Sequence, residues 1–241
     1  MKQTYLLALL AIYFITTFSS QKAFASEQST YNFSWLDPDK EVYVLQNRKY
    51  RKVGKFHVMA GYGKTLSGPF VDAYSIQGRA GYFIVEDWGF EFVYAKNSGK
   101  ENETAQAVRN PGGAGTNPFR RITNNYMGGM ILWSPFYAKV NTFNSILYVD
   151  WMLGAGYGQI KETNNRDEVI SGGTSNIVKT ETHDGILWGT ALKFYYTQMI
   201  HVRWDLTGLH YQAIRAKVND ADKSKAWYNN YDMTLSLGVN F

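Results

Sequence analysis

The clearest pattern in the chain is its last stretch, where apolar and polar residues alternate without a break. Because side chains of a strand point alternately to opposite faces, residues 231–241 predict a strand with one apolar and one small or polar face. The apolar face holds Tyr231, Met233, Leu235, Leu237, Val239 and Phe241, and the polar face holds Asp232, Thr234, Ser236, Gly238 and Asn240.

The same alternation recurs upstream and predicts further strands. We expect them at 56–62, 74–84, 90–94, 122–133, 147–157, 186–194 and 200–206. Their polar faces carry mostly small residues, as the narrow inside of a barrel requires. With the last stretch the count is even, so both ends of the chain return to one side of a membrane.

The lengths of the connections alternate as well. Those at 96–121, 160–183 and 212–226 are long and polar, whereas those after the second, fourth and sixth strands are shorter, including 134–144. Residues 64–70 are an exception. Short turns on one side and long loops on the other are typical of outer-membrane barrels. The sequence therefore predicts an all-β fold, an eight-stranded antiparallel transmembrane β-barrel of the outer-membrane type.

The beginning of the chain predicts export. Lys2, an apolar run from Leu6 to Phe18 and the small residues Ala23 and Ala25 indicate a signal peptide at 1–25, cleaved before Ser26. The run is shorter than the ~20 residues that a membrane-spanning helix needs. We expect a periplasmic N-terminal segment at 26–54, whose basic run at 47–52 is a solvated face, and the barrel at 55–241.

Composition narrows the class of protein. Aromatic residues make up 16% of the chain, with 18 Tyr and 7 Trp, and such rings suit the two membrane–water interfaces. The chain has no cysteine, which excludes disulfides and thiolate chemistry. A net charge of +5 is too small and too dispersed for nucleic-acid binding. A soluble exported β-sandwich is the remaining alternative to the barrel.

Six charged residues are expected to point into the barrel. An eight-stranded barrel is just wide enough for side chains to fill it, and buried charges need partners. We therefore expect a salt-bridge network that plugs the lumen. The alternative is a thin ion path through a small porin-like channel. The six residues are Arg79, Glu91, Asp150, Lys193, Arg203 and Asp205.

The histidines do not indicate an enzyme. His57, His183, His201 and His210 stand in no His-x-Ser pattern and show no metal-ligand spacing. We expect no catalytic residue, no metal and no cofactor, and an outer-membrane lipid hydrolase is the third alternative for function.

Lipids and further copies of the chain are the expected partners. Loop cations could meet lipopolysaccharide phosphates, or they are simply solvated: Arg109, Arg120, Arg121, Lys217, Lys223 and Lys225. Gly78, Ala80 and Gly128 are expected to leave notches in the lipid-facing surface, where homo-oligomers could pack and hold lipid.

The last stretch also resembles the C-terminal signal that the barrel-assembly machinery reads in Gram-negative outer-membrane proteins, with Tyr231, Leu237, Val239 and Phe241 as its anchors. The machinery is therefore an expected partner during insertion.

Two further stretches resemble a known family. Residues 42–56, with Gln46, Asn47, Arg48, Lys49 and Tyr50, and residues 134–140, Ser-Pro-Phe-Tyr-Ala-Lys-Val, are similar to small outer-membrane β-barrel domain proteins of predatory and gliding bacteria of the myxobacterial and Bdellovibrio type. More broadly, the chain resembles barrels of the OmpA and OmpX type. The resemblance implies a barrel in the cell outer membrane, a structural or lipid- and surface-binding role, and no enzymatic activity.

Overall fold

The computed structural model describes residues 28–31, 42–45, 48–66, 68–110, 112, 115–142, 145–171, 177–216 and 224–241. The signal peptide predicted at 1–25 lies outside these residues. The chain divides into two compact units, Met1–Lys49 and Tyr50–Phe241. In the first unit, β1 (Gln28–Tyr31) pairs antiparallel with β2 (Val42–Leu45).

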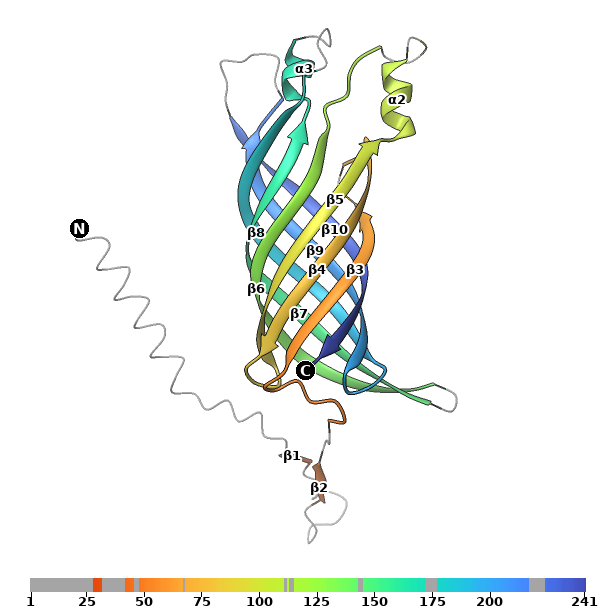
Figure 1. The fold of residues 1–241 in the computed structure, drawn as a ribbon, viewed down its shortest axis with the longest axis vertical. Coiled ribbons are helices and arrows are strands. Elements are labelled where there is room, and N and C mark those ends of the chain that lie inside the picture. The colour runs from red at the N-terminus through yellow and green to blue at the C-terminus, as the bar shows by residue number, and fades with distance from the viewer. Residues whose placement is uncertain are drawn as a thin grey trace, which may run out of the picture. The chain divides into compact units, whose positions relative to one another are not determined.

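The second unit is a closed barrel of eight antiparallel strands in the order β10-β3-β4-β5-β6-β7-β8-β9, which confirms the predicted fold (Figure 1). The last strand closes the ring against the first, with Leu237 opposite Ala60. The strands are β3 (Phe56–Thr65), β4 (Val71–Phe83), β5 (Trp88–Glu101), β6 (Arg121–Thr142), β7 (Ser145–Asn164), β8 (Lys179–Tyr195), β9 (Ile200–Ile214) and β10 (Lys225–Asn240).

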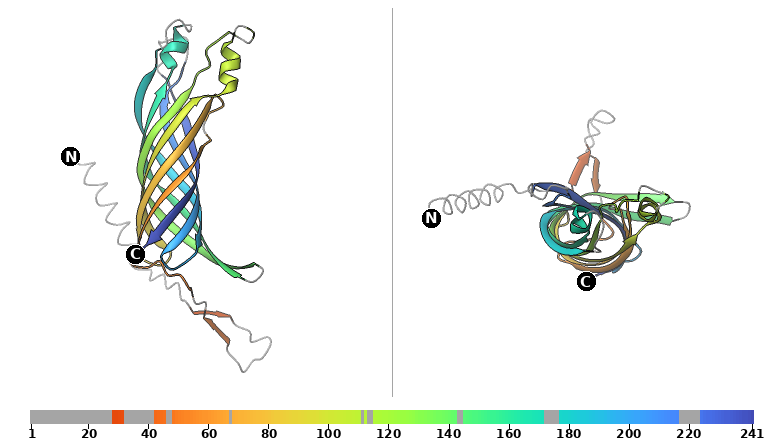
Figure 2. Two further views of the ribbon diagram at one scale, coloured as in Figure 1. Left: turned by 45° about the vertical axis from the view of Figure 1, so that its right-hand side comes forward. Right: turned by 90° about the horizontal axis from the view of Figure 1, so that it is seen from above.

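The two ends of the barrel differ, and seen along its axis the strands form a ring (Figure 2). The turn end carries the connections from β4 to β5, from β6 to β7 and from β8 to β9. The loop end carries the longer connections, with the short helices α2 (Glu103–Arg109) and α3 (Arg166–Ile170), and the short connection 66–70. This agrees with the predicted alternation of connection lengths and its one exception. Among the described residues, no helix is both long and apolar enough to cross a bilayer.

The strands are longer than the sequence predicts. Segments expected as loops or turns continue the ladders: β5 runs on to Glu101, β6 to Thr142, β7 to Asn164, and β8 begins at Lys179. The reason is physical. Alternating hydropathy marks only the part of a strand whose outer face is apolar, whereas the hydrogen-bonded ladder continues through polar residues.

Burial follows the predicted alternation in β10. Met233, Leu235 and Leu237 face outward, while Asp232 and Thr234 are buried inside the barrel. The inner wall is divided between two kinds of side chain. Polar residues dominate on β3, β4 and β10, and an apolar cluster lies across β5 to β9, formed by Val93, Ala95, Tyr126, Met130, Ile160, Leu187, Leu209, Tyr211 and Ala213.

This apolar cluster explains one wrong prediction, the outward face of Gly128. Gly128 is buried on the inner face of β6 beside Tyr126 and Met130, and a Cβ there would lie 2.6 Å from the carbonyl oxygen of Tyr157. Its neighbour Gly129 faces outward, where a Cβ would meet nothing within 4 Å. Both faces of β6 are apolar, so alternation alone could not tell inside from outside.

Candidate functional site in the lumen and at the barrel mouth

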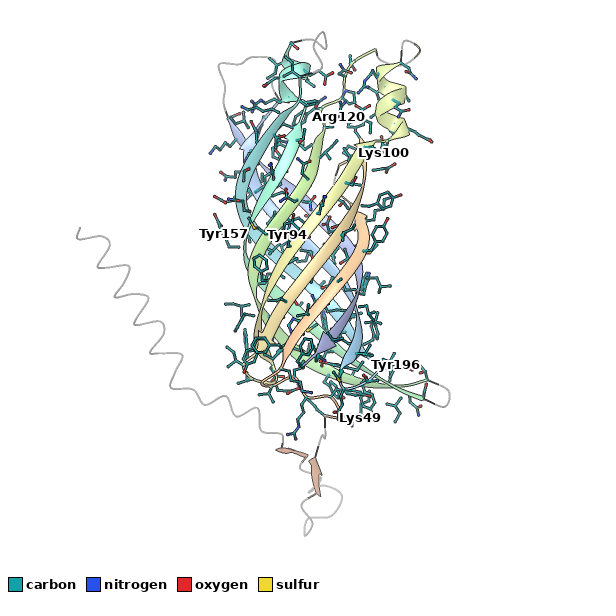
Figure 3. All side chains as sticks on the ribbon, in the orientation of Figure 1. Lys49, Tyr94, Lys100, Arg120, Tyr157 and Tyr196 are labelled. Carbon is teal, nitrogen blue, oxygen red and sulfur yellow. The ribbon has the colours of Figure 1, made fainter. Side chains whose placement is uncertain are left out.

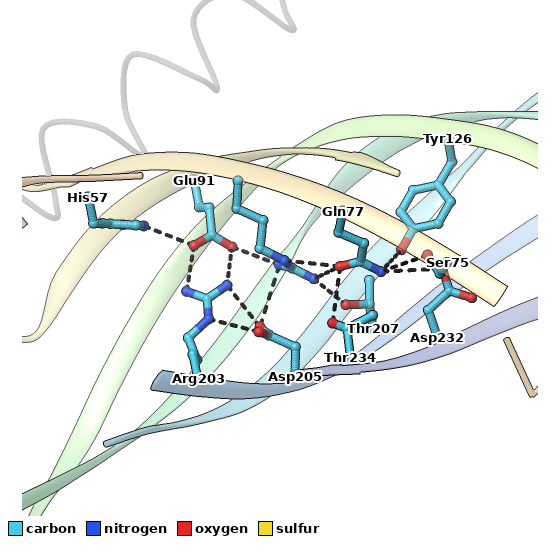
Figure 4. Close-up of polar contacts among 11 residues, drawn as sticks. His57, Ser75, Gln77, Glu91, Tyr126, Arg203, Asp205, Thr207, Asp232 and Thr234 are labelled. Atoms are coloured by element: carbon cyan, nitrogen blue, oxygen red, sulfur yellow. Dashed lines mark hydrogen bonds and ion pairs between the residues drawn. The ribbon is translucent and has the colours of Figure 1, made fainter. Parts of the chain in front are cut away.

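An ionic cluster crosses the lumen nearer the turn end (Figure 4). Glu91 accepts hydrogen bonds from Arg203 at 2.6 and 2.9 Å and from Arg79 at 2.8 Å. His57 Nε2 lies 2.9 Å from the same carboxylate. Asp205 completes the cluster at 2.8 Å from Arg203 and 3.7 Å from Arg79. Two arginines thus face two carboxylates, and the charges of the four side chains balance.

A polar network continues from this cluster toward the loop end (Figure 4). Arg79 bonds Gln77, whose amide donates to the hydroxyl of Tyr126 at 2.8 Å. Asp232 accepts from Ser75 at 2.9 Å and from Asn97 at 3.1 and 3.2 Å. The acidic group of Asp232 is therefore held by neutral donors on β4 and β5.

The chain segment before β3 closes the turn end of the lumen. Lys52 is 2% exposed, and its Nζ donates to Ser134 at 2.6 Å and to Asp150 at 2.8 Å. Its backbone N–H donates to both carboxylate oxygens of Glu86, and Tyr50 stacks on Tyr195 at 5.0 Å. We refer to Tyr50–Gly54 as the plug segment.

The plug segment corrects one expectation. The basic run at 47–52 is not wholly a solvated face, because Lys52 reaches a buried carboxylate. The compact unit that contains the barrel includes this segment and begins at Tyr50, whereas the first barrel strand begins at Phe56.

The structure buries all six predicted lumen charges but does not unite them in one network. Arg79, Glu91, Arg203 and Asp205 share the ionic cluster. Asp150 is paired with Lys52 and accepts a 2.5 Å hydrogen bond from Tyr195. Lys193 donates to Asn240 at 2.9 Å.

A second charged group, which sequence spacing did not reveal, lies inside the loop end. Glu162 is ion-paired with Arg121, accepts from Tyr211, and lies 3.1 Å from His183 Nε2. Strand register produces this group: Glu181 lies opposite Glu162 on β8, and His183 follows two residues later on the same face. One carboxylate oxygen each of Glu162 and Glu181 and one ring nitrogen of His183 lie within 4.8 Å of one another, a spacing that could hold a metal ion. The Arg121 guanidinium already compensates the Glu162 charge.

The environment shifts the titration of two of these groups. Burial lowers the pKa of His183 below its ordinary value, against the opposing charge of Glu181. Burial alone would raise the pKa of Glu181, but a hydrogen bond from Lys179 and the charge of Arg166 bring the pKa below its ordinary value. At neutral pH the His183 imidazole is therefore neutral and the Glu181 carboxylate is ionised.

The predicted loop cations are divided among ion pairs. Arg109 and Arg120 both pair with Glu101, which joins α2 to the start of β6. Arg121 points inward, over the Tyr228 ring at 4.1 Å. Lys225 begins β10 and is exposed, and Lys217 and Lys223 lie outside the described residues.

The remaining predicted positions lie on the outer face. Gly78 and Ala80 face outward on β4, and their use for packing in a homo-oligomer remains a prediction. Leu237 and Phe241 face outward near the turn end, where the Phe241 N–H donates to the carbonyl oxygen of Phe56. Their role in assembly also remains a prediction.

The barrel can be compared with known proteins. No family model and no curated protein matches the chain, so the resemblance to barrels of predatory and gliding bacteria stays a prediction. Several solved structures match most of the chain. The N-terminal β-barrel domain of Pseudomonas aeruginosa OprF is 15% identical, with 78% of this chain and 98% of that chain covered and a TM-score of 0.46.

For Neisserial surface protein A the identity is 16%, the coverage 77% and 94%, and the TM-score 0.42. Ail, the attachment invasion locus protein of Yersinia pestis, is 13% identical, with 78% of this chain and 99% of that chain covered and a TM-score of 0.37. All three TM-scores are below 0.5, so we draw nothing about function from them.

Proposed function

We propose that this chain is a non-enzymatic integral outer-membrane β-barrel with a closed lumen, and that its role is structural or lipid- and surface-binding. The observation that carries the proposal is a belt of exposed apolar side chains around the whole barrel. Every barrel strand contributes outward residues to it, among them Val58, Ile76, Phe92, Ile131, Tyr157, Ile186, Trp204 and Leu235.

The belt has the dimensions and borders of a lipid-facing surface. Its longest runs, such as Tyr74 to Tyr82 in β4, span nine residues, close to the ~9–11 residues of a tilted transmembrane strand. Aromatic pairs border it on both sides: Trp88 stacks on Trp133 near the turn end, and Tyr62 stacks on Tyr74 nearer the loop end. Soluble proteins rarely expose a continuous apolar surface of this size.

The contents of the lumen favour a closed barrel over a channel. The space between the ionic cluster and Met130, Leu132 and Met152 measures about 10 Å³, which is about the volume that a single water needs. The plug segment fills the turn end below it.

Two of the histidines, His57 and His210, take part in contacts that favour a structural role over catalysis. His57 bonds Glu91 inside the lumen. On the outer face, Trp188 Nε1 donates to His210 Nε2 at 2.6 Å, and the other ring nitrogen of His210 lies 2.6 Å from Asn229 Oδ1. Both ring nitrogens of His210 are therefore occupied by neighbours.

A pair of substitutions in β10 tests the membrane assignment. Leu235 and Trp227 face outward and are each 59% exposed, but only Leu235 lies within the belt. Leu235→Arg in lipid vesicles should lower the free energy of unfolding by about 2–4 kcal/mol, because an arginine inside the hydrocarbon layer is poorly solvated. Trp227→Arg should change it by less than about 1 kcal/mol. Urea titration of folded and unfolded bands on unboiled gels measures both.

The same gels can also contradict the membrane assignment. A folded barrel migrates differently from its boiled form, and a soluble sandwich would unfold in the unboiled detergent. The membrane proposal would be contradicted if the two arginine variants lowered the free energy of unfolding equally, or if boiled and unboiled samples migrated alike.

A further inference from the structure

Exposed lysines lie at the loop end on several strands, among them Lys64 on β3, Lys179 on β8 and Lys225 on β10, but among the described strands only one pair flanks a single residue of the strand between them. Just beyond the tyrosines that border the belt, β5 carries Lys96 and β7 carries Lys161, both exposed. Neither lysine has an ion pair among the described residues. The nearest outward carboxylate on the next strand, Asp184, accepts a hydrogen bond from Gln159.

Strand register sets these lysines on either side of an amide. Lys96 lies opposite Asn125 of β6, and Asn125 lies opposite Lys161. Two strand spacings separate the lysine backbones by roughly 10 Å, which two flexible lysine side chains can bridge. Two ammonium groups and one amide can therefore converge on one anion, in the manner of a phosphate site.

Farther from the loop end than this triad, beyond Met127, the belt has an open position on β6. Gly129 faces outward with open space at its Cβ position, and its neighbours across the ladder are Phe92 on β5 and Tyr157 on β7. Tyr94 and Met127 lie between the glycine and the triad, on the same outer face. Figure 3 shows Tyr94 and Tyr157 on the barrel below Lys100 and Arg120 of the loop end. A glycine between two aromatic side chains forms a shallow apolar channel, the shape that an acyl chain fills.

We propose that Lys96, Asn125 and Lys161, with the channel over Gly129, form a binding site for a phosphorylated lipid of the leaflet at the loop end. The headgroup phosphate lies between the lysines, and an acyl chain packs over Gly129 between Phe92 and Tyr157. Charge complementarity selects the phosphate, and continuity of the triad with the apolar belt selects a lipid over a soluble anion. The inference rests on the proposed membrane location.

Native mass spectrometry of the full barrel tests the site. The purified protein in mild detergent is titrated with dioleoyl phosphatidic acid, with dioleoylglycerol and with inorganic phosphate. The unsubstituted barrel should retain a single phosphatidic acid molecule and show no retention of the other two. The double variant Lys96→Gln/Lys161→Gln should bind phosphatidic acid roughly tenfold more weakly or worse, because two charge-assisted hydrogen bonds are lost. Gly129→Trp, which fills the channel, should weaken binding similarly.

Matched variants separate a site from a general effect of charge or bulk. Lys179→Gln/Lys225→Gln removes the same charge at the same end, from β8 and β10, and should leave binding within about twofold. Gly78→Trp adds the same bulk at another open outward glycine and should also leave it unchanged.

Several results would overturn the site. They are equal losses in the matched variants, equal retention of dioleoylglycerol, or competition by millimolar inorganic phosphate. If the barrel inserts into vesicles and stays folded in unboiled detergent but shows no preference among the lipids, the proposed lipid site is wrong and the proposed membrane location is not affected. If the barrel does not insert, the proposed function fails first.

Discussion

At the scale of single residues, Glu91 is the side chain on which most of the buried charge depends. It contacts Arg79, Arg203 and His57, and these four side chains are almost fully buried. In such a setting, an ion pair contributes less through its own attraction than through the cost of leaving a partner unpaired. We therefore expect the cluster to fix how the strands face one another more than it adds net stability.

Glu91→Gln should lower the free energy of unfolding by about 3–5 kcal/mol, because two buried guanidinium groups would then face only Asp205. Urea unfolding in lipid vesicles, followed by the gel shift, measures the loss. The control is Glu103→Gln, an exposed carboxylate of α2, which should change stability little. Adding Arg203→Gln to Glu91→Gln should recover part of the loss, and a double variant as unstable as the sum of the two singles would contradict this account.

At the scale of elements, the plug segment makes the turn end a stable closure. Its backbone and its one buried lysine bind different parts of the barrel: the Lys52 amide binds Glu86, the Gly54 amide donates to Phe83 at 2.9 Å, and Lys52 Nζ reaches Asp150. The side chain thus anchors a segment that contributes no strand.

Lys52→Met should loosen the plug segment without unfolding the barrel. Loss of the charged hydrogen bonds is worth about 1.5–3 kcal/mol, which corresponds to roughly tenfold to hundredfold faster exchange of the Lys52 and Gly54 amides. Hydrogen exchange read by NMR or mass spectrometry measures it, with Lys55→Met as the control. Unchanged exchange would show that the Lys52 side chain is not needed to hold the segment. Adding Asp150→Asn to Lys52→Met removes the unpaired buried carboxylate that the single variant leaves.

The sequence predicts the strands whose outer face alone is apolar, but it does not predict the contacts that form inside the barrel. Seven strands were oriented correctly because one face was apolar and the other small or polar. β6 was reversed because Met127 and Ile131 outside are as apolar as Met130 and Leu132 inside. The contact of Glu162 with His183 depends on the register of β7 and β8. The contact of Lys52 with Asp150 depends on a segment that folds back onto the barrel. The spacing of residues along the sequence predicts neither.

At the scale of the whole molecule, side chains occupy most of the barrel lumen. The plug segment, the ionic cluster and the group around Glu162 follow one another from the turn end to the loop end, and the polar and apolar parts of the inner wall lie side by side around it. Function is therefore expected on the outer surface and the loops.

Planar bilayers containing the barrel should show no steady ion current, because the space beside the ionic cluster accommodates about one water. Single-channel recording at both polarities is the measurement, with protein-free bilayers as the control. A steady conductance that changes with Arg203→Ala would instead support the ion path along the lumen charges.

The pairing of β3 with β10 has a consequence for how the barrel forms. His57 lies opposite Asn240, so the final ladder joins residues from opposite ends of the barrel unit. Neighbouring hairpins can form from local contacts, but this ladder has the largest loop-closure entropy and must wait for the last strand. Until then two strand edges stay open and can pair with other chains. The slow step of folding is therefore expected at this seam, whatever the speed of the hairpins.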